Sequence, residues 1–536
     1  MILLILFCYI FAAASCSRTE SRLVNIIQGP VRGYKQPDDD IYIFYNIPYA
    51  TAPTGSQRFK APLPPPNWTE PYEAVDKEII CPQGNLMGFI HKPKRIQEDC
   101  LVASVYAPNT EEKNIPVVVY VHGGAFFTGW GDFAVPKSLV KSKKVIAVTF
   151  NYRLGAHGFL CLGTKDIPGN AGMKDQVALL RWVNKNIASF GGNPEEITIA
   201  GFSSGASSVD LLMLSKMTDG LFKRVIPESG ANIAAFSIQS DPIKNAKEYA
   251  MMLNFDKYDN INALQDFYKT IGYEELHSVN VINRRDSTFL LSPCVERNLG
   301  EETFLEDNPV NILKKGNFKT VPMLYGFTNM EGLFRVPLFE QWKVLMNEKF
   351  SNFLPADLKF NNDTEMEEVA EKVRQFYFGA KYVEDETILG FVNYFADIMF
   401  TYPILRSVKF QVEAGNHEIY LYEYSYFDDT TPYIPHTSIR GAAHCAQSFA
   451  ILDGVASVDE NHSKSLRELW LNFMTTGKPV PSGTKLPAWP PVRADWSPHM
   501  SLNKTFELKG SLQKERALFW ENIYEKYYYN PLTPAP

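Results

Sequence analysis

The sequence predicts an α/β protein built on a mostly parallel sheet. Residues 117–121, 145–150 and 197–200 are short, nearly continuous apolar runs rich in β-branched side chains, which is typical of strands buried on both faces. Between the last two runs, residues 175–190 carry apolar side chains at helical spacing and are followed by Gly-Gly-Asn, a helix stop. The order strand, helix, strand favours helices on both faces of the sheet.

Two later apolar runs, residues 321–327 and 418–424, extend the same sheet further along the chain. Residues 241–317 and 338–396 interleave Leu, Phe and Tyr with Glu and Lys, so both segments are expected to be mostly helical and to cover the carboxyl edge of the sheet. Linkers, charge blocks and repeats are not evident, and residues 18–536 are therefore expected to form a single domain.

The composition indicates a large globular protein and argues against binding to nucleic acid or anionic lipid. The 536 residues are 45% hydrophobic and 13% aromatic, which is ample material for a large core. A formal net charge of −7 provides no electrostatic basis for binding nucleic acid or anionic lipid. A small neutral or cationic ligand is easier to accommodate.

The N-terminus predicts secretion. Residues 1–17 form an apolar run that ends in small residues, which fits a signal peptide better than a membrane span, with a buried first strand as the alternative. The C-terminal residues 527–536 resemble neither a retention signal nor an anchor tail, so a secreted protein without a membrane anchor is expected. Four N-glycosylation sequons support a secretory route; they lie at Asn67, Asn362, Asn461 and Asn503.

The cysteines predict a disulfide and no metal site, and they leave open whether Cys161, Cys294 and Cys445 are free. Of seven cysteines, Cys8 and Cys16 lie in or beside the signal, and the other five lack the spacing of metal ligands. Cys81 and Cys100, the pair closest in sequence, are the best candidates for a bridge in an oxidising compartment. Five is odd, so at least one thiol stays free, and Cys445 is expected to be buried and inert.

The stretch Gly201-Phe202-Ser203-Ser204-Gly205 matches G-x-S-x-G. It follows a predicted strand and precedes a predicted helix, the setting in which a strained turn exposes a nucleophilic hydroxyl. A plain Ser/Gly-rich loop is the alternative. The setting favours Ser203 as a nucleophile, with Ser204 contributing only its backbone N–H.

A second glycine turn follows the strand at residues 117–121. Gly123, Gly124 and Ala125 are candidates for an oxyanion hole, in which backbone N–H groups stabilise the tetrahedral intermediate of acyl transfer. Two complementary turns, each directly after a strand of one sheet, favour a catalytic role over two unrelated loops.

Several long motifs carry a family resemblance: residues 98–108, 122–126, 151–160, 168–206, 228–230 and 441–444. With these motifs the chain resembles the type-B carboxylesterase and cholinesterase family of α/β-hydrolases over nearly its whole mature length. The resemblance implies the α/β-hydrolase fold and a serine esterase that needs no cofactor or metal. Its substrate would be a small-molecule ester.

Residue by residue, the resemblance implies Ser203 as nucleophile, Glu331 as acid and His444 as base, in the chain order usual for these hydrolases. His436 is the nearest rival for the base. The N–H groups of Gly124, Ala125 and Ser204 would hold the oxyanion.

The resemblance also implies supporting contacts. Ser229 would lie beside the triad and support Glu331, or else serve a structural turn. Cys81 would pair with Cys100, and Arg58 would form an ion pair with Glu98.

Departures from the family are informative. Ala125 stands where a third glycine is common, and Ser204 stands where Ala is common. The second disulfide of the family is expected to be absent, leaving packing to stabilise that region. Between Cys81 and Cys100 no tryptophan is present to bind a choline cation, so choline esters are poor candidates.

The sequence therefore predicts a secreted, glycosylated esterase for small, mostly apolar esters, most like insect secreted carboxylesterases, including antennal enzymes that degrade odorant or pheromone esters. Xenobiotic esters fit the same description. A non-catalytic, cholinesterase-like adhesion or binding protein is the alternative from another class, although all three triad residues are present. A juvenile-hormone-type esterase is a third option, whose usual elbow has Gln where Phe202 stands. Oligomeric state is left open.

Overall fold

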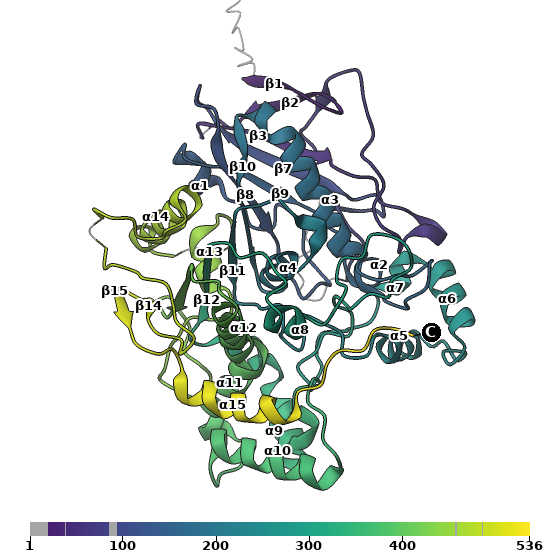
Figure 1. Cartoon of the computed structure of the whole chain (residues 1–536), viewed down its shortest axis with the longest axis vertical. Helices are drawn as coiled ribbons and strands as arrows, with labels where there is room; N and C mark the ends of the chain where they lie inside the picture. Colours follow the sequence, from purple (N-terminus) through teal and green to yellow (C-terminus); the bar gives the residue numbers. More distant parts are fainter. Residues whose placement is uncertain (1–19, 38, 85–93, 456–457, 485, 536) are drawn as a thin grey trace, which may run out of the picture.

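The computed structural model describes residues 20–37, 39–84, 94–455, 458–484 and 486–535. The proposed signal, residues 1–17, lies outside this part of the chain. The described residues form a large α/β structure in which helices cover a central sheet (Figure 1).

One sheet of thirteen strands organises the described part of the chain. Its strands are β1 (Ser21–Ile26), β2 (Gly29–Lys35), β3 (Ile41–Pro48), β4 (Tyr72–Glu73), β7 (Val102–Pro108), β8 (Ile115–Val121), β9 (Ile146–Phe150), β10 (Gly192–Phe202), β11 (Arg224–Glu228), β12 (Met323–Thr328), β13 (Ile419–Tyr424), β14 (His499–Leu502) and β15 (Phe506–Lys509). The five predicted apolar runs correspond to β8, β9, β10, β12 and β13, although residues 145, 321–322 and 418 precede β9, β12 and β13.

The strand order is β1-β2-β3-β7-β9-β8-β10-β11-β12-β13-β14-β15, with β4 beside β2. From β9 to β14 every neighbouring pair is parallel, whereas β1, β2, β3, β7 and β9 pair antiparallel, as do β14 and β15. The parallel centre brings the carboxyl ends of β8, β10, β11, β12 and β13 to one edge. Loops that follow these strands can therefore share one site.

The helices are α1 (Lys137–Lys141), α2 (Gly155–Phe159), α3 (Ala171–Asn186), α4 (Ser204–Leu212), α5 (Pro242–Met252), α6 (Ile261–Thr270), α7 (Tyr273–Leu276), α8 (Pro309–Lys314), α9 (Phe339–Glu348), α10 (Asp363–Phe378), α11 (Ile388–Ala396), α12 (Tyr402–Glu413), α13 (Ala446–Ile451), α14 (Glu460–Thr476) and α15 (Lys514–Tyr527). The predicted helix at 175–190 corresponds to α3, which a left-handed Gly191 follows after one 3₁₀ turn. The strand-helix alternation is therefore confirmed.

Two hydrophobic cores lie on the two faces of the sheet. Alternate residues of β8 divide between them: Val117 and Val119 belong to one core, and Val118 and Tyr120 to the other. The first core also contains residues of α3 and α12, while the second contains residues of α1, α13 and α14. In Figure 1, α1, α13 and α14 lie left of the centre and α3 lies to the right. Burial of both faces explains the nearly continuous apolar strands.

The long segments after β11 and β12 differ from the expectation in one respect. Residues 338–396 are mostly helical, as predicted, but residues 277–308 contain no helix or strand, so the segment 241–317 is only partly helical. Its side chains are nonetheless largely buried between Phe289 and Val295. Apolar composition signalled burial there rather than helix.

One stretch, Asp385–Glu413, has the length and hydropathy of a membrane span, but 83% of its apolar window is buried inside the protein. Packing in the core accounts for this apolar character.

Candidate active site

Ser203 occupies a sharp turn between β10, which ends at Phe202, and α4, which begins at Ser204. Its backbone is strained, with φ 56° and ψ −126°. The N–H of Ser203 donates a hydrogen bond to the carbonyl oxygen of Glu228 at the end of β11, at 2.9 Å. The neighbouring strand thus holds the strained residue in place.

The glycines flanking this turn are required by close approach. A Cβ atom at Gly201 would lie 2.6 Å from the backbone of Gly205, and one at Gly205 would lie 2.3 Å from the carbonyl oxygen of Val121. Real Cβ atoms do not approach backbone so closely. The predicted reason for both glycines, room for close packing, matches this geometry.

Ser203, His444 and Glu331 form one line of hydrogen bonds. Ser203 Oγ lies 2.9 Å from His444 Nε2, and His444 Nδ1 is hydrogen-bonded to Glu331 Oε2. Glu331 is fully buried, and its Oε1 accepts a hydrogen bond from the N–H of Thr328 at 2.8 Å. A serine, an imidazole and a buried carboxylate in this order can activate the hydroxyl as a nucleophile.

His436, the rival for the base, lies elsewhere. Its ring nitrogens are 3.7 Å from Glu340 and 3.4 Å from Asp385, on α9 and the turn after α10. Among the described residues, these three side chains form a cluster compact enough for a metal ion. Lys343 already donates to both carboxylates, at 2.7 and 2.8 Å, and compensates part of their charge.

Two phenylalanine rings pack against His444. The Phe400 ring centroid lies 4.3 Å from that of the imidazole, and that of Phe334 lies at 5.4 Å. Phe400 belongs to a π-helical turn, Asp397–Thr401, that joins α11 to α12. Such a widened turn is common at functional sites. The sequence showed only an abundance of aromatic residues, which does not indicate the particular pair.

The glycine turn after β8 lies against the Ser203 turn. Gly124, Ala125 and Phe126 all have positive φ angles, and a Cβ at Gly123 would lie 2.6 Å from the carbonyl oxygen of Phe202. Within the described part of the chain, the N–H groups of Gly124 and Ala125 donate to no protein acceptor. Free N–H groups beside the serine suit an oxyanion.

Ser204 contributes more than the expected backbone N–H. As the first residue of α4, it has an N–H without an intrahelical partner. Its side chain also accepts a hydrogen bond from the N–H of Phe126, at 3.2 Å. The hydroxyl therefore makes a contact beyond the expected role of the backbone N–H: it connects the two turns, a contact that depends on their packing.

Ser229 does not support Glu331 by a hydrogen bond, contrary to that option in the sequence prediction. Its Oγ accepts from Gln447 Nε2 at 2.8 Å, and its N–H donates to the carbonyl oxygen of Gly326 at 2.9 Å. The oxygens of Glu331 are bonded to Thr328 and His444 instead. Ser229 therefore connects β11 to α13.

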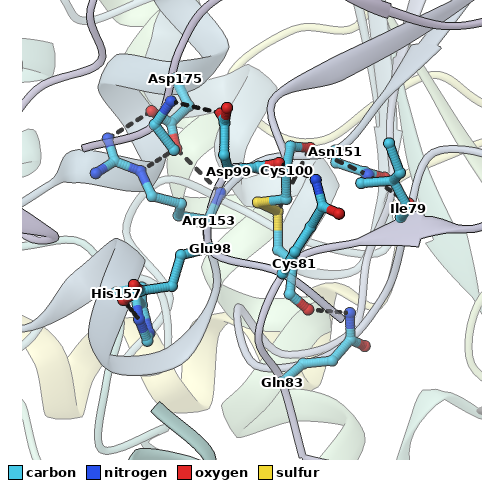
Figure 2. The surroundings of a disulfide bond; sticks show 12 residues. Ile79, Cys81, Gln83, Glu98, Asp99, Cys100, Asn151, Arg153, His157 and Asp175 are labelled. Atoms are coloured by element: carbon cyan, nitrogen blue, oxygen red, sulfur yellow. Dashed lines mark hydrogen bonds and ion pairs between the residues drawn. A yellow bond between two sulfur atoms is a disulfide. The ribbon is translucent and has the colours of Figure 1, made fainter. Parts of the chain in front are cut away.

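The predicted disulfide Cys81–Cys100 is present, and Figure 2 shows it beside Gln83 and Asn151. Gln83 Nε2 donates to the carbonyl oxygen of Cys81 at 3.1 Å, and Gln83 Oε1 accepts from the N–H of Gly129 at 2.8 Å. The bridge is thus connected to the end of the turn that contains Gly124.

A second disulfide joins Cys161 and Cys294, whose pairing the sequence left open; it is not the sequence-close bridge of the family that was expected to be absent. They are separated by 133 residues and meet only in the folded chain, so sequence proximity does not reveal the pair. Cys445 is buried, as predicted, and it is free; burial raises the pKa of its thiol well above the usual value.

Two further sets of predicted residues are the ion pair of Arg58 with Glu98 and the four sequon asparagines. Arg58 Nε lies 3.0 Å from Glu98 Oε1, and the same carboxylate is hydrogen-bonded to His157 (Figure 2). The sequon residues Asn67, Asn362 and Asn461 are exposed and Asn503 is half-buried.

A strained serine turn that joins a strand of a mostly parallel sheet to a helix is typical of the α/β-hydrolase class. The sequence profile described as "Carboxylesterase family" matches residues 20–520. The chain belongs to this family, and it is a carboxylic ester hydrolase.

Two sequence relatives and one solved structure are consistent with this family assignment. The chain is 30% identical to a carboxylic ester hydrolase of Bombus ignitus, over 96% of each chain. It is 35% identical to a juvenile hormone esterase of Heliothis virescens, over 77% of this chain and 76% of the relative. The crystal structure of juvenile hormone esterase from Manduca sexta, with OTFP covalently attached, has a TM-score of 0.82 at 28% identity and covers 94% of this chain and 100% of that chain.

Proposed function

We propose that this protein is a secreted serine carboxylesterase that hydrolyses small, mostly apolar esters through an acyl-enzyme on Ser203. The observation that carries the proposal is the 2.9 Å contact of Ser203 Oγ with His444 Nε2, together with the hydrogen bond from His444 to the buried Glu331.

In the first half of the reaction, Ser203 Oγ attacks the ester carbonyl carbon while His444 Nε2 takes the hydroxyl proton. The negative charge on the carbonyl oxygen is stabilised by the N–H groups of Gly124, Ala125 and Ser204, each contributing about 3 kcal/mol. The C–O bond of the ester then breaks, and His444 gives its proton to the leaving alcohol. Ser203 is left acylated.

In the second half, water attacks the acyl carbon while His444 accepts one of its protons. Collapse of the second tetrahedral intermediate releases the carboxylic acid, and the proton returns to Ser203. Glu331 keeps the imidazole oriented and stabilises its cationic form in both halves.

The surroundings of His444 support apolar substrates. Phe400 and Phe334 cover the imidazole, and Phe236 packs against Phe400 with ring centroids 5.5 Å apart. An aromatic wall excludes water and favours apolar acyl or alcohol groups. Secretion and glycosylation at Asn67, Asn362, Asn461 and Asn503 are proposed from the N-terminal segment and the sequons.

The test compares hydrolysis of a chromogenic acetate by the secreted protein and by its Ser203→Ala form. The variant is expected to lose at least about a thousandfold in kcat. Equal rates would reject the triad, and they would leave a non-catalytic binding role for this site as the better explanation.

A juvenile-hormone-type activity is the second candidate, supported by the similarity to the juvenile hormone esterases of Heliothis virescens and Manduca sexta. A panel of aliphatic acetates, aromatic esters and a terpenoid methyl ester separates the two. If the protein prefers small esters, kcat/KM should be higher for the acetates than for the terpenoid methyl ester. If it is a juvenile-hormone-type esterase, OTFP is expected to inactivate the wild-type protein.

A further inference from the structure

Glu228 places a buried carboxyl group beneath the candidate active site. The residue ends β11 and has no exposed surface. Its Oε2 accepts hydrogen bonds from the hydroxyl of Tyr120 at 2.6 Å and from the hydroxyl of Ser448 at 2.9 Å. Tyr120 belongs to β8 and Ser448 to α13, so one carboxylate oxygen joins three elements.

The backbone at the same strand end holds the nucleophile. The carbonyl oxygen of Glu228 accepts the hydrogen bond from the N–H of Ser203 at 2.9 Å. The next residue, Ser229, accepts a hydrogen bond from Gln447 of α13 at 2.8 Å. Two consecutive residues therefore contact the nucleophile turn on one side and α13 on the other.

Helix α13 begins at Ala446, two residues after His444, and the intervening Cys445 has a left-handed backbone with φ 65°. A displacement of α13 would therefore move the end of the His444 loop that is attached to this helix. Such a displacement matters, because a shift of about 1 Å between catalytic groups costs on the order of a hundredfold in rate.

We propose that Glu228 is a positioning residue for ester hydrolysis, whose carboxyl group holds α13, and through it His444, in register with Ser203. This inference rests on the proposed function of Ser203 and His444. Glu228 touches neither the substrate nor the reacting atoms, and it acts through Ser448 and α13.

The environment of Glu228 makes this contact sensitive to pH. Burial raises the pKa of Glu228 to about 7. The titratable groups that face it are Tyr120 of β8, Tyr422 of β13 and Cys445 before α13, and burial raises the pKa of each well above its usual value. All three are neutral at pH 7, so the state of the contact follows the proton on Glu228 itself.

Asp210 offers a matched control. It is equally buried, on α4, and burial raises its pKa to about 7 as well. Its Oδ2 accepts from the N–H of Asn232 at 2.8 Å and from the hydroxyl of Tyr325 at 2.9 Å, and not from α13. Removing Asp210 deletes a comparable buried carboxyl group without releasing that helix.

The experiment compares Glu228→Ala with Asp210→Ala in the full chain. The kcat and KM for a chromogenic acetate are measured per active site, and active sites are counted by titration with a fluorophosphonate. Glu228→Ala is expected to lower kcat at least about tenfold with KM within about twofold of wild type, because only the alignment for attack is lost. Asp210→Ala is expected to keep kcat per site within about twofold.

Glu228→Gln tests the role of the proton. The amide oxygen can still accept from Tyr120 and Ser448, so kcat at pH 8 is expected to recover to within about threefold of wild type. The acid limb of the plot of log kcat against pH is expected to contain one ionisation fewer than in the wild type. A purely structural role would leave that limb unchanged.

Ser448→Ala keeps the proposal testable if Glu228→Ala does not fold, because it removes the contact from the side of α13; a loss of at least about threefold in kcat is expected. A kcat per site in Glu228→Ala or Ser448→Ala that matches Asp210→Ala would overturn the proposal.

Ser203→Ala distinguishes a failure of this positioning role from a failure of the proposed function. If it is inactive while Glu228→Ala resembles the control, only the positioning role fails, whereas an active Ser203→Ala rejects the proposed function.

Discussion

The hydroxyl of Ser204 accepts a hydrogen bond from the backbone N–H of Phe126 at 3.2 Å. Ser204 begins α4 directly after Ser203, and Phe126 follows Ala125 in the glycine turn. One hydroxyl therefore fixes the distance between the two turns that are proposed to hold the oxyanion. The residues on either side of this contact must act together for the oxyanion to be stabilised.

Replacing Ser204 by Ala is expected to lower kcat for a chromogenic acetate about three- to tenfold, since the N–H groups of Gly124 and Ala125 lose part of their preorganisation. KM should change less than kcat. The control is Ser208→Ala on the same helix, whose hydroxyl bonds to the carbonyl oxygen of Ser204 and to Gln176. Equal effects of the two substitutions would speak against a role in the turn.

Gly205→Ala is expected to prevent the nucleophile turn from forming, because its Cβ would lie 2.3 Å from the carbonyl oxygen of Val121. The clash is with backbone of a central strand, which cannot move aside. Little or no soluble, active enzyme should be secreted. Gly510→Ala, where no atom lies within 4 Å of the new Cβ, should behave as the wild type.

The disulfide Cys161–Cys294 closes a loop of 133 residues, whereas Cys81–Cys100 closes one of 19. Loop-closure entropy then predicts that a Cys161→Ser/Cys294→Ser variant loses about 4–5 kcal/mol of unfolding free energy, against about 3 kcal/mol for the shorter loop. Urea unfolding of both double variants measures the difference. A larger loss for the shorter loop would refute this entropic ranking.

Asp210 should make stability fall as the pH rises towards neutrality. Its pKa is 3.8 in the unfolded reference and about 7 in the folded protein, because burial disfavours the charge. Between these values the folded state holds a proton that the unfolded state has lost, so stability decreases with rising pH across this window and is constant above it.

Asp210→Asn removes this dependence. The variant should gain stability relative to the wild type between pH 4 and pH 7, reaching on the order of 4 kcal/mol at pH 7 and levelling off above it. Urea unfolding at pH 4.5, 6 and 8 provides the measurement. A difference that does not vary with pH would show that Asp210 is not protonated in the folded enzyme.

Much of the fold could be predicted because it follows from local patterns. The apolar runs at 117–121 and 197–200 coincide with β8 and β10, since strands buried on both faces must be apolar throughout. The turn at Ser203 was equally predictable, because its two glycines meet backbone that lies close along the chain or in the adjacent strand. The segment 277–308 was not, since its apolar residues pack without regular structure.

The line from Ser203 through His444 to Glu331 was expected from chain order within a recognised family, and its geometry depends on the fold. Only the tertiary structure decided which side chains surround that line: Phe400 against His444, Ser229 with Gln447, Cys161 with Cys294 and Glu228 with Ser448. Each pair joins elements that are distant in the chain and adjacent only after the sheet has formed. Residue type and spacing determine the local secondary structure of a segment. Which distant side chains it contacts depends on burial and on the loops that meet at the carboxyl edge of the parallel strands.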